Sequence, residues 1–150
     1  MNSSRTFFVF LALAISMGLC VPSAALAKEE MSRHTREIHG PIPLNGATLQ
    51  QARRAILLGM YYNKGLKLTY EGETANIVTA RWDYRGDTVV LDVRYDDKQI
   101  QVLYRAASEE LECQELESGI CHNGTHRYYN YIPNFTKSIR NQLARVVRTK

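Results

Sequence analysis

The chain has 150 residues, a length typical of one domain, and its 45% hydrophobic residues with only 9 Gly and 4 Pro exclude a collagen-like or wholly disordered protein. The formal net charge of +4 is a mild basic excess, too small to indicate a nucleic-acid-binding protein. Beyond the N-terminal region no apolar run reaches about 18 residues, so no internal transmembrane helix is expected.

The first 27 residues have the features of a secretory signal peptide. Arg5 forms a short positive region, Phe7–Leu19 is an apolar run, and residues 25–27 give the small-x-small pattern of a cleavage site. We therefore predict cleavage after Ala27, with no transmembrane anchor left afterwards, and the Ala-rich composition favours a bacterial periplasm. Removing residues 1–27 takes away one basic residue and leaves a net charge of +3.

Two alternatives stay open for this segment. The first is a retained membrane anchor, for which the apolar run is short. The second is a lipoprotein modified at Cys20, for which the preceding Leu19 is bulkier than the small residue that a lipobox places there.

A polar tether and a helix are expected next. Residues 28–46 are polar and hold Pro41 and Pro43, which predicts a tether with order only near Ile38–Leu44. Thr48 and Gln51 form a capping-box pattern, and apolar residues then recur at helical spacing. The pattern predicts a helix over 48–62, near the start of a single α+β domain over residues 47–150.

Alternation of apolar and polar residues then predicts four strands, at about residues 66–71, 77–82, 89–95 and 100–105. With Arg85 and Gly86 as a two-residue turn, Trp82 faces Val89, and every apolar residue of the second strand meets an apolar partner. We expect Trp82 to be buried. The opposite face should meet water through Lys67, Thr69, Arg81, Asp92, Arg94, Gln101 and Arg105.

The last segment is predicted to be helical, with an apolar stripe at Ile132, Phe135, Ile139, Leu143 and Val146. Proline disrupts the interior of a helix, so Pro133 leaves two possibilities: it lies in the first turn, or an earlier helical turn from Thr125 is kinked there. The predicted fold class is α+β: a four-stranded antiparallel meander with an N-terminal and a C-terminal helix on one face, in the order α-β-β-β-β-α.

Two cysteines remain after cleavage, Cys113 and Cys121, and an even pair in an exported chain predicts a disulfide. The alternatives are free thiols or a metal site that adds His122 and His126, although His122 directly follows a cysteine, unlike the usual zinc-finger spacing.

Enzyme motifs are lacking from the sequence. No nucleophile motif surrounds either cysteine, and neither a Gly-x-Ser-x-Gly elbow nor a Gly-rich phosphate loop occurs. We therefore assign no catalytic residue, no metal ligand and no cofactor.

Charge is unevenly distributed along the C-terminal half. Residues 109–117 hold five acidic residues and no basic one, whereas from Arg127 onward there are six basic residues and no acid. Helical spacing places Lys137, Asn141, Arg145 and Arg148 on one face, away from the apolar stripe. That face is interpreted either as a solvated surface or as a contact site for an anionic surface, such as lipid headgroups or lipopolysaccharide phosphates.

Residues 128–132 are rich in tyrosine and follow His126. Most such clusters pack in a core, but solvent-exposed tyrosine hydroxyls can also bind a ligand. Residues 102–108 and 126–132 resemble matching stretches in a family of small, exported, uncharacterised proteobacterial proteins, with Tyr131 or Ile132 where that family has Trp. The resemblance implies a signal or lipoprotein sequence and a final helix, and it implies no activity.

The sequence thus favours a soluble periplasmic module that binds an envelope protein or an anionic envelope component, with no nucleic-acid partner. The alternative is a small envelope enzyme with a site near His126 and the adjacent tyrosines. The candidate binding residues are His126, Tyr129, Asn130, Lys137, Arg145 and Arg148.

Overall fold

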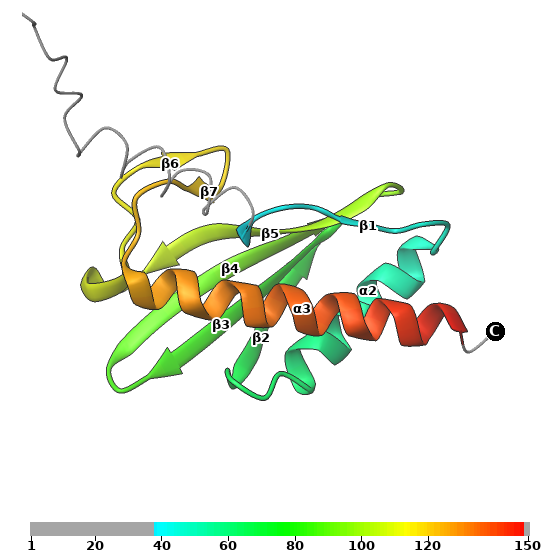
Figure 1. The fold of residues 1–150 in the computed structure, drawn as a ribbon, viewed down its shortest axis with the longest axis horizontal. Coiled ribbons are helices and arrows are strands. Elements are labelled where there is room, and N and C mark those ends of the chain that lie inside the picture. The colour runs from blue at the N-terminus through cyan, green and yellow to red at the C-terminus, as the bar shows by residue number, and fades with distance from the viewer. Residues whose placement is uncertain (1–37, 149–150) are drawn as a thin grey trace, which may run out of the picture.

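The computed structural model describes residues 38–148, so the signal peptide predicted over 1–27 and the first part of the predicted tether, 28–37, lie outside the described residues (Figure 1). The elements are β1 (Ile42–Pro43), α2 (Leu49–Tyr61), β2 (Leu68–Thr74), β3 (Ile77–Tyr84), β4 (Asp87–Tyr95), β5 (Gln99–Ala107), the short 3-10 helix η1 (Glu109–Leu111), β6 (Leu116–Glu117), β7 (Ile120–Cys121) and α3 (His126–Arg148).

The main sheet is antiparallel and its strand order is β1-β5-β4-β3-β2. The predicted α+β class is confirmed, and the four predicted strands are β2 to β5. The predicted strand count is wrong by one, because β1 adds a fifth strand from the segment assigned to the tether. A strand of two residues, one of which is Pro43, carries no alternating pattern, which is why the sequence does not reveal β1. A separate two-stranded ribbon, β6–β7, precedes α3.

The β3–β4 hairpin has the predicted register. Trp82 pairs with Val89, and the two apolar pairs beyond them, Ala80 with Leu91 and Val78 with Val93, also form. The turn residues Arg85 and Gly86 both have positive φ, at 54° and 92°. Positive φ at both central residues matches the right-handed twist of the flanking strands, so this turn sets the register.

Helix α2 starts with the predicted capping box. Thr48 accepts a hydrogen bond from the Gln51 backbone N–H, and the Gln51 side chain accepts one from the Thr48 backbone N–H. These two bonds satisfy backbone donors that a helix start leaves unpaired. The buried residues of α2, which include Ala52, Ala55, Ile56 and Met60, join the core, where α2 packs mainly against α3 and also contacts β2, β3 and β4.

Helix α3 begins at His126, so Pro133 lies inside it rather than in its first turn. Figure 1 shows α3 as one continuous helix that runs along the sheet. Pro133 removes one backbone donor from the helix. Ile132 and Phe135, at 1% and 0% exposure, are buried close to it, so packing holds the helix together across this position.

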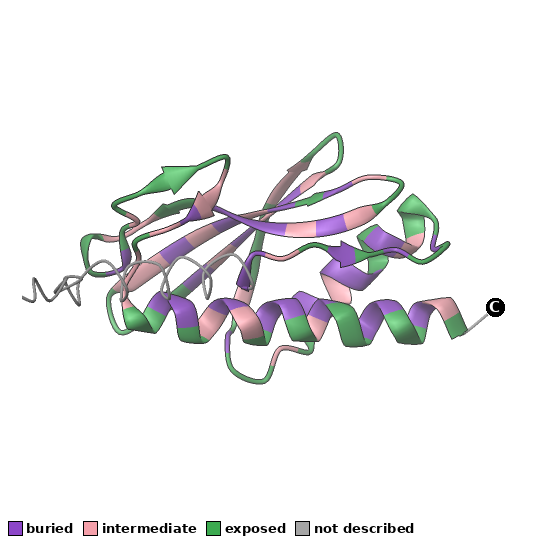
Figure 2. Cartoon of the chain, turned by 45° about the horizontal axis from the view of Figure 1, so that its top comes forward, coloured by how far each residue is buried: buried purple, intermediate pink, exposed green. Residues whose placement is uncertain are grey.

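Both helices cover the same face of the sheet, and the core lies between them and the strands (Figure 2). The opposite face holds the predicted polar residues, of which Lys67, Thr69, Arg94 and Arg105 are exposed and Arg81, Asp92 and Gln101 half-buried. Leu103 is a buried exception on this face, because Gly119 of the β6–β7 ribbon packs against its side chain. The β6–β7 ribbon thus covers one end of the face of the main sheet that is otherwise exposed to solvent.

Candidate functional site

The structure does not bring the predicted aromatic site together. His126 and Asn130 are exposed, four residues apart on α3, whereas Tyr129 is buried. The Tyr129 hydroxyl accepts a hydrogen bond from the Gly124 backbone N–H at 2.7 Å. This hydrogen bond of Tyr129 stabilises the turn before α3.

Cys113 and Cys121 form the predicted disulfide, with their Cα atoms 5.7 Å apart. It ties the segment after η1 to β7. Because each sulfur is bonded to the other, neither is available as a thiolate ligand or nucleophile. Within residues 38–148, no group of three or more His, Cys, Asp or Glu side chains is arranged to hold a metal ion.

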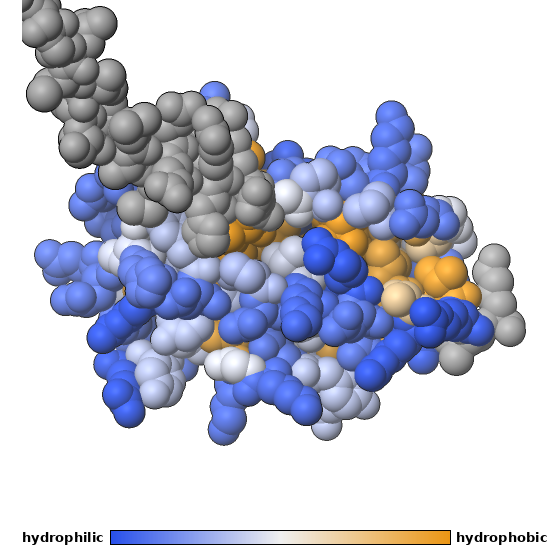
Figure 3. Space-filling view, viewed as in Figure 1, coloured by the Kyte–Doolittle hydropathy of each residue, from blue (hydrophilic) through white to orange (hydrophobic). Residues whose placement is uncertain are grey.

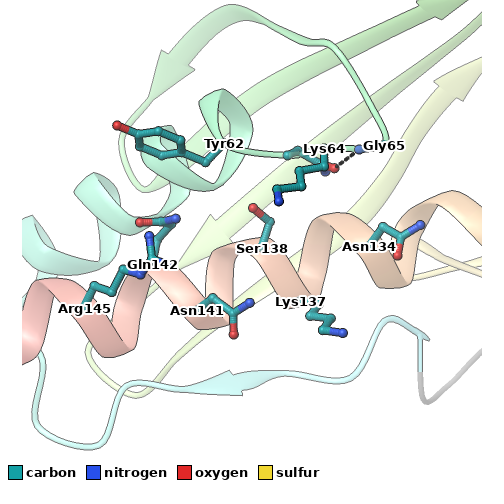
Figure 4. Close-up of a pocket in the computed structure, with 10 residues that line it drawn as sticks. Tyr62, Lys64, Gly65, Asn134, Lys137, Ser138, Asn141, Gln142 and Arg145 are labelled. Carbon is teal, nitrogen blue, oxygen red and sulfur yellow. Dashed lines mark hydrogen bonds between the residues drawn. The ribbon is translucent and has the colours of Figure 1, made fainter.

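A polar groove of about 510 Å³ lies between the C-terminal end of α2 and the middle of α3. The loop after α2 contributes one wall and α3 the other (Figure 4). The lining residues are Tyr62, Asn63, Lys64, Gly65, Asn134, Lys137, Ser138, Asn141, Gln142 and Arg145. The α3 members recur at spacings of three and four, so they form one stripe of the helix.

Positive charge and neutral hydrogen-bonding groups dominate this groove. Lys64, Lys137 and Arg145 are its cations, and none of the ten lining residues is acidic. In Figure 4, Lys64 extends from the loop toward α3, and Ser138 extends from α3 toward α2. The Ser138 hydroxyl donates to the Gly59 carbonyl at 2.8 Å and thereby fixes the distance between the two helices.

The loop wall of the groove is held by Asn63. Its side-chain oxygen accepts a hydrogen bond from the Gly65 backbone N–H at 3.0 Å, which closes the loop locally. The side-chain nitrogen of Asn63 is buried and has no hydrogen-bond partner in the structure. A buried donor of this kind is satisfied by an acceptor from outside the chain or by water.

The predicted basic face is divided between two grooves. Lys137, Asn141 and Arg145 line the groove between α2 and α3, whereas Arg148 lies beside an apolar groove between β1 and α3. Helical spacing indicated the α3 residues of the first groove, but no pattern pointed to Lys64, because a lysine in a polar loop is common and its neighbours are set by the packing of α2 on α3.

A buried histidine that sequence reasoning missed lies at the other end of the domain. His39 is 1% exposed, and its Nδ1 lies 2.8 Å from the Val102 carbonyl oxygen. Its Nε2 lies 3.0 Å from the Tyr128 hydroxyl. A carbonyl only accepts, so Nδ1 carries the hydrogen, and Tyr128 donates to Nε2. His39 therefore occupies the edge of β5 next to β1 and satisfies a strand carbonyl there.

Burial keeps both partners of this pair neutral. Desolvation lowers the pKa of His39 below its usual value and outweighs the opposing effect of the Val102 carbonyl, while nearby His122 lowers it further. Desolvation also raises the pKa of Tyr128 far above its usual range, with contributions from Tyr104 and Tyr129. The pair is fully hydrogen-bonded inside the core, so its geometry supports a structural role.

A cluster at the surface joins α2 to the sheet. The Arg53 guanidinium donates to the Glu73 carboxylate at 2.8 Å, and the Tyr95 hydroxyl donates to the same carboxylate at 2.7 Å. Desolvation and the neighbouring Glu73 raise the pKa of Tyr95 to about 12. Every member has a partner inside the cluster, so we assign it to the attachment of α2 rather than to a ligand.

Comparison of the chain with protein-family models, with curated proteins and with solved structures found no match. Over residues 38–148, none of the helices combines the length and apolar character that crossing a membrane requires. The groove between α2 and α3 is therefore the candidate site on its own geometry.

Proposed function

We propose that this protein is an exported binding module of the bacterial periplasm and that it attaches to phosphate headgroups of envelope lipids through the groove between α2 and α3. One observation carries the proposal: three cations and several neutral donors line a groove in which none of the lining residues is acidic. Lysine and arginine are the side chains that bind phosphate oxygens most strongly.

The distribution of charge over the whole of α3 supports this interpretation. The acidic stretch 109–117 forms η1 and β6 beside the N-terminal end of α3, whereas Arg145 and Arg148 lie in its last turn (Figure 1). Lys137 and Arg145 lie 11 and 19 residues beyond the first residue of α3, roughly 17 and 29 Å along the helix axis, compared with a screening length of about 8 Å at physiological salt. The acidic stretch therefore offsets little of the positive charge in the groove.

The proposed compartment rests on the signal-peptide features of residues 1–27, and the disulfide is compatible with an oxidising compartment. The resemblance to small exported proteobacterial proteins stays a prediction. The alternative of an envelope enzyme near His126 has no support from geometry, because His126 is exposed and Tyr129 is buried in a separate contact.

The test is co-sedimentation of the processed chain with phosphatidylglycerol and phosphatidylcholine vesicles at low and physiological salt. We expect binding to phosphatidylglycerol only, weakened by salt, since each basic residue near an anionic surface contributes about 1 kcal/mol. The variant Lys64→Gln/Lys137→Gln/Arg145→Gln should lose this binding.

A matched control removes the same charge elsewhere. Lys67, Arg94 and Lys98 are exposed and lie outside the groove. Their triple substitution by Gln should leave most of the vesicle binding intact. Equal losses in both triple variants would show that net charge alone drives the association, and they would contradict the groove as the site.

A further inference from the structure

A second groove runs between β1 and α3, and its lining differs from that of the first. Its volume is about 360 Å³, and apolar residues from β1 and from α3 face each other across it. The lining residues are Ile42, Pro43, Leu44, Asn45, Arg140, Leu143, Ala144, Val147 and Arg148. Figure 3 shows apolar surface in this region bordered by strongly hydrophilic side chains.

The walls of this groove are fixed by the sheet and the core. Ile42 pairs with Ile100 of β5, and the Leu44 backbone N–H donates to the Lys98 carbonyl at 2.8 Å. Ile42, Leu44 and Leu143 are 1%, 2% and 6% exposed, so their backbones and most of their side chains are held by the rest of the domain. The groove is preformed, which lowers the entropic cost of filling it.

The strand beside the groove is poorly suited to binding a peptide by strand addition. β1 spans only Ile42–Pro43, and both Pro43 and the preceding Pro41 lack a backbone N–H donor. A peptide laid along this edge would leave its own backbone groups unpaired in an apolar groove, which is costly. An unbranched hydrocarbon chain has no polar backbone and meets no such penalty.

Two arginines define the polar part of the occupant. Arg140 and Arg148 lie eight residues apart on α3, roughly 12 Å along the helix axis, with Leu143, Ala144 and Val147 between them. None of the nine lining residues is acidic. Guanidinium groups bind carboxylates through paired hydrogen bonds, and their methylene stems cover apolar surface.

We propose that this groove binds the alkyl chain of a free, single-chain fatty carboxylate, with the carboxylate held by Arg140 or Arg148. The apolar residues between the two arginines contact the alkyl chain of the ligand. One of the arginines, at the end of this apolar wall, pairs with the carboxylate. This site shares no lining residue with the groove between α2 and α3, so it is a second binding function, independent of the first.

The test is calorimetric titration of the processed chain with laurate below its micelle-forming concentration. Wild type is expected to bind one laurate. Ala144 is exposed on the groove, so Ala144→Trp fills the groove from outside the core, and Ala144→Glu adds a charge that repels the carboxylate. Both variants should lose laurate binding while they keep the wild-type melting temperature, which is measured to confirm that they are folded. Arg140→Gln/Arg148→Gln should weaken it about tenfold or more.

Two controls distinguish laurate binding in this groove from non-specific adsorption and from binding in the groove between α2 and α3. Lauryl alcohol, which lacks the charge, should bind more weakly than laurate. The variant Lys64→Gln/Lys137→Gln/Arg145→Gln should bind laurate like wild type even where it loses vesicle binding. The proposal is overturned if wild type binds no laurate or if both Ala144 variants bind laurate normally. It is also overturned if the protein binds phosphatidylglycerol vesicles but not laurate, and if that vesicle binding depends on Arg140 and Arg148.

Discussion

The His39–Tyr128 pair is the residue-scale feature with the clearest consequence for stability. The unfolded chain binds a proton on His39 near pH 6.5, but burial lowers the pKa of His39 in the folded protein. Between these two pKa values the unfolded state holds more protons than the folded state. The stabilisation from neutral His39 is therefore complete above pH 6.5 and is lost progressively as the pH falls below that value.

We expect His39→Gln to lower the free energy of unfolding at neutral pH by about 1–3 kcal/mol, because the substitution disturbs the buried hydrogen bonds to Val102 and Tyr128. The variant should also lose part of the drop in stability below pH 6.5. Urea unfolding on both sides of this pH measures both effects. His126→Gln is the control at an exposed histidine outside this pair, and it should keep the wild-type free energy of unfolding at neutral pH. An unchanged slope in His39→Gln would contradict the argument.

Trp82 gives a second prediction at this scale. It is 4% exposed, and its ring centroid lies 4.3 Å from that of Tyr131 on α3. Trp82→Ala should cost about 3–5 kcal/mol of unfolding free energy, and native Trp82 fluorescence should be shifted to the blue. Tyr84 stacks on the outer side of Trp82 but is 47% exposed, so Tyr84→Ala should cost much less. Water-like emission from the native protein would refute the burial.

At the scale of elements, the crossing of α2 and α3 depends on Gly59. A Cβ atom placed on Gly59 would lie 2.8 Å from Ile139 Cγ1 and 3.0 Å from its Cα, so part of the clash is with backbone. We expect Gly59→Ala to destabilise the protein by about 1–3 kcal/mol, even though alanine favours helices. Gly65→Ala is the matched control, because the nearest atoms to its Cβ would be 3.7 and 3.8 Å away.

Thermal unfolding of the two glycine variants distinguishes close packing from a general effect of losing glycine. A lower melting temperature in Gly59→Ala alone is the expected result. Equal melting temperatures would mean that α2 and α3 adjust their separation easily, and the Ser138–Gly59 hydrogen bond would then not fix the width of the groove.

The Cys113–Cys121 disulfide orders the segment that leads into α3. In the chain-entropy model, closing so short a loop contributes about 2–3 kcal/mol. Reduction of the disulfide should therefore lower the melting temperature of wild type. It should leave the melting temperature of the variant Cys113→Ala/Cys121→Ala unchanged. Mass analysis after alkylation without reductant checks the bond itself, and two alkylated thiols in the untreated protein would contradict it.

The sequence predicted the elements in which apolar residues recur at a regular spacing, and it missed the elements that are too short to show such a spacing. Strands β2 to β5 were found because their alternation runs over several residues between turns, and the Arg85–Gly86 turn fixed the register of Trp82. β1 spans two residues and carries no period. Helical spacing indicated the direction of Lys137 and Arg145 relative to the core, but not the loop with Lys64 that lies beside them.

Buried polar contacts were equally hidden. His39 contacts Val102 and Tyr128, which lie 63 and 89 residues away in the sequence. A single histidine near a proline gives no signal of such a contact. Only the arrangement of β1 along β5, with α3 across the same end, brings these three residues together.

At the scale of the whole molecule, positive charge gathers at the end of α3 that the helix dipole favours. The acidic residues of 109–117 precede its N-terminal end, and Arg145 and Arg148 occupy its last turn. Positive charge in the last turn of a helix is stabilising, whereas the first turn of α3 holds no acidic residue and the acidic stretch 109–117 lies outside the helix.

Export is a prediction for the whole chain, and we expect the mature protein to begin at Lys28. The intact mass of protein recovered from the periplasm measures this directly. A chain that retains residues 1–27, or an N-terminus acylated at Cys20, would contradict cleavage after Ala27.

The position of β1 has a further consequence for how the chain is made. Residues 38–43 are the first described segment to be synthesised, yet β5 is made much later and Tyr128 follows His39 by 89 residues. Contacts between distant parts of a chain form slowly and only after both parts exist. A growing chain therefore cannot complete the core of this domain until α3 has left the ribosome.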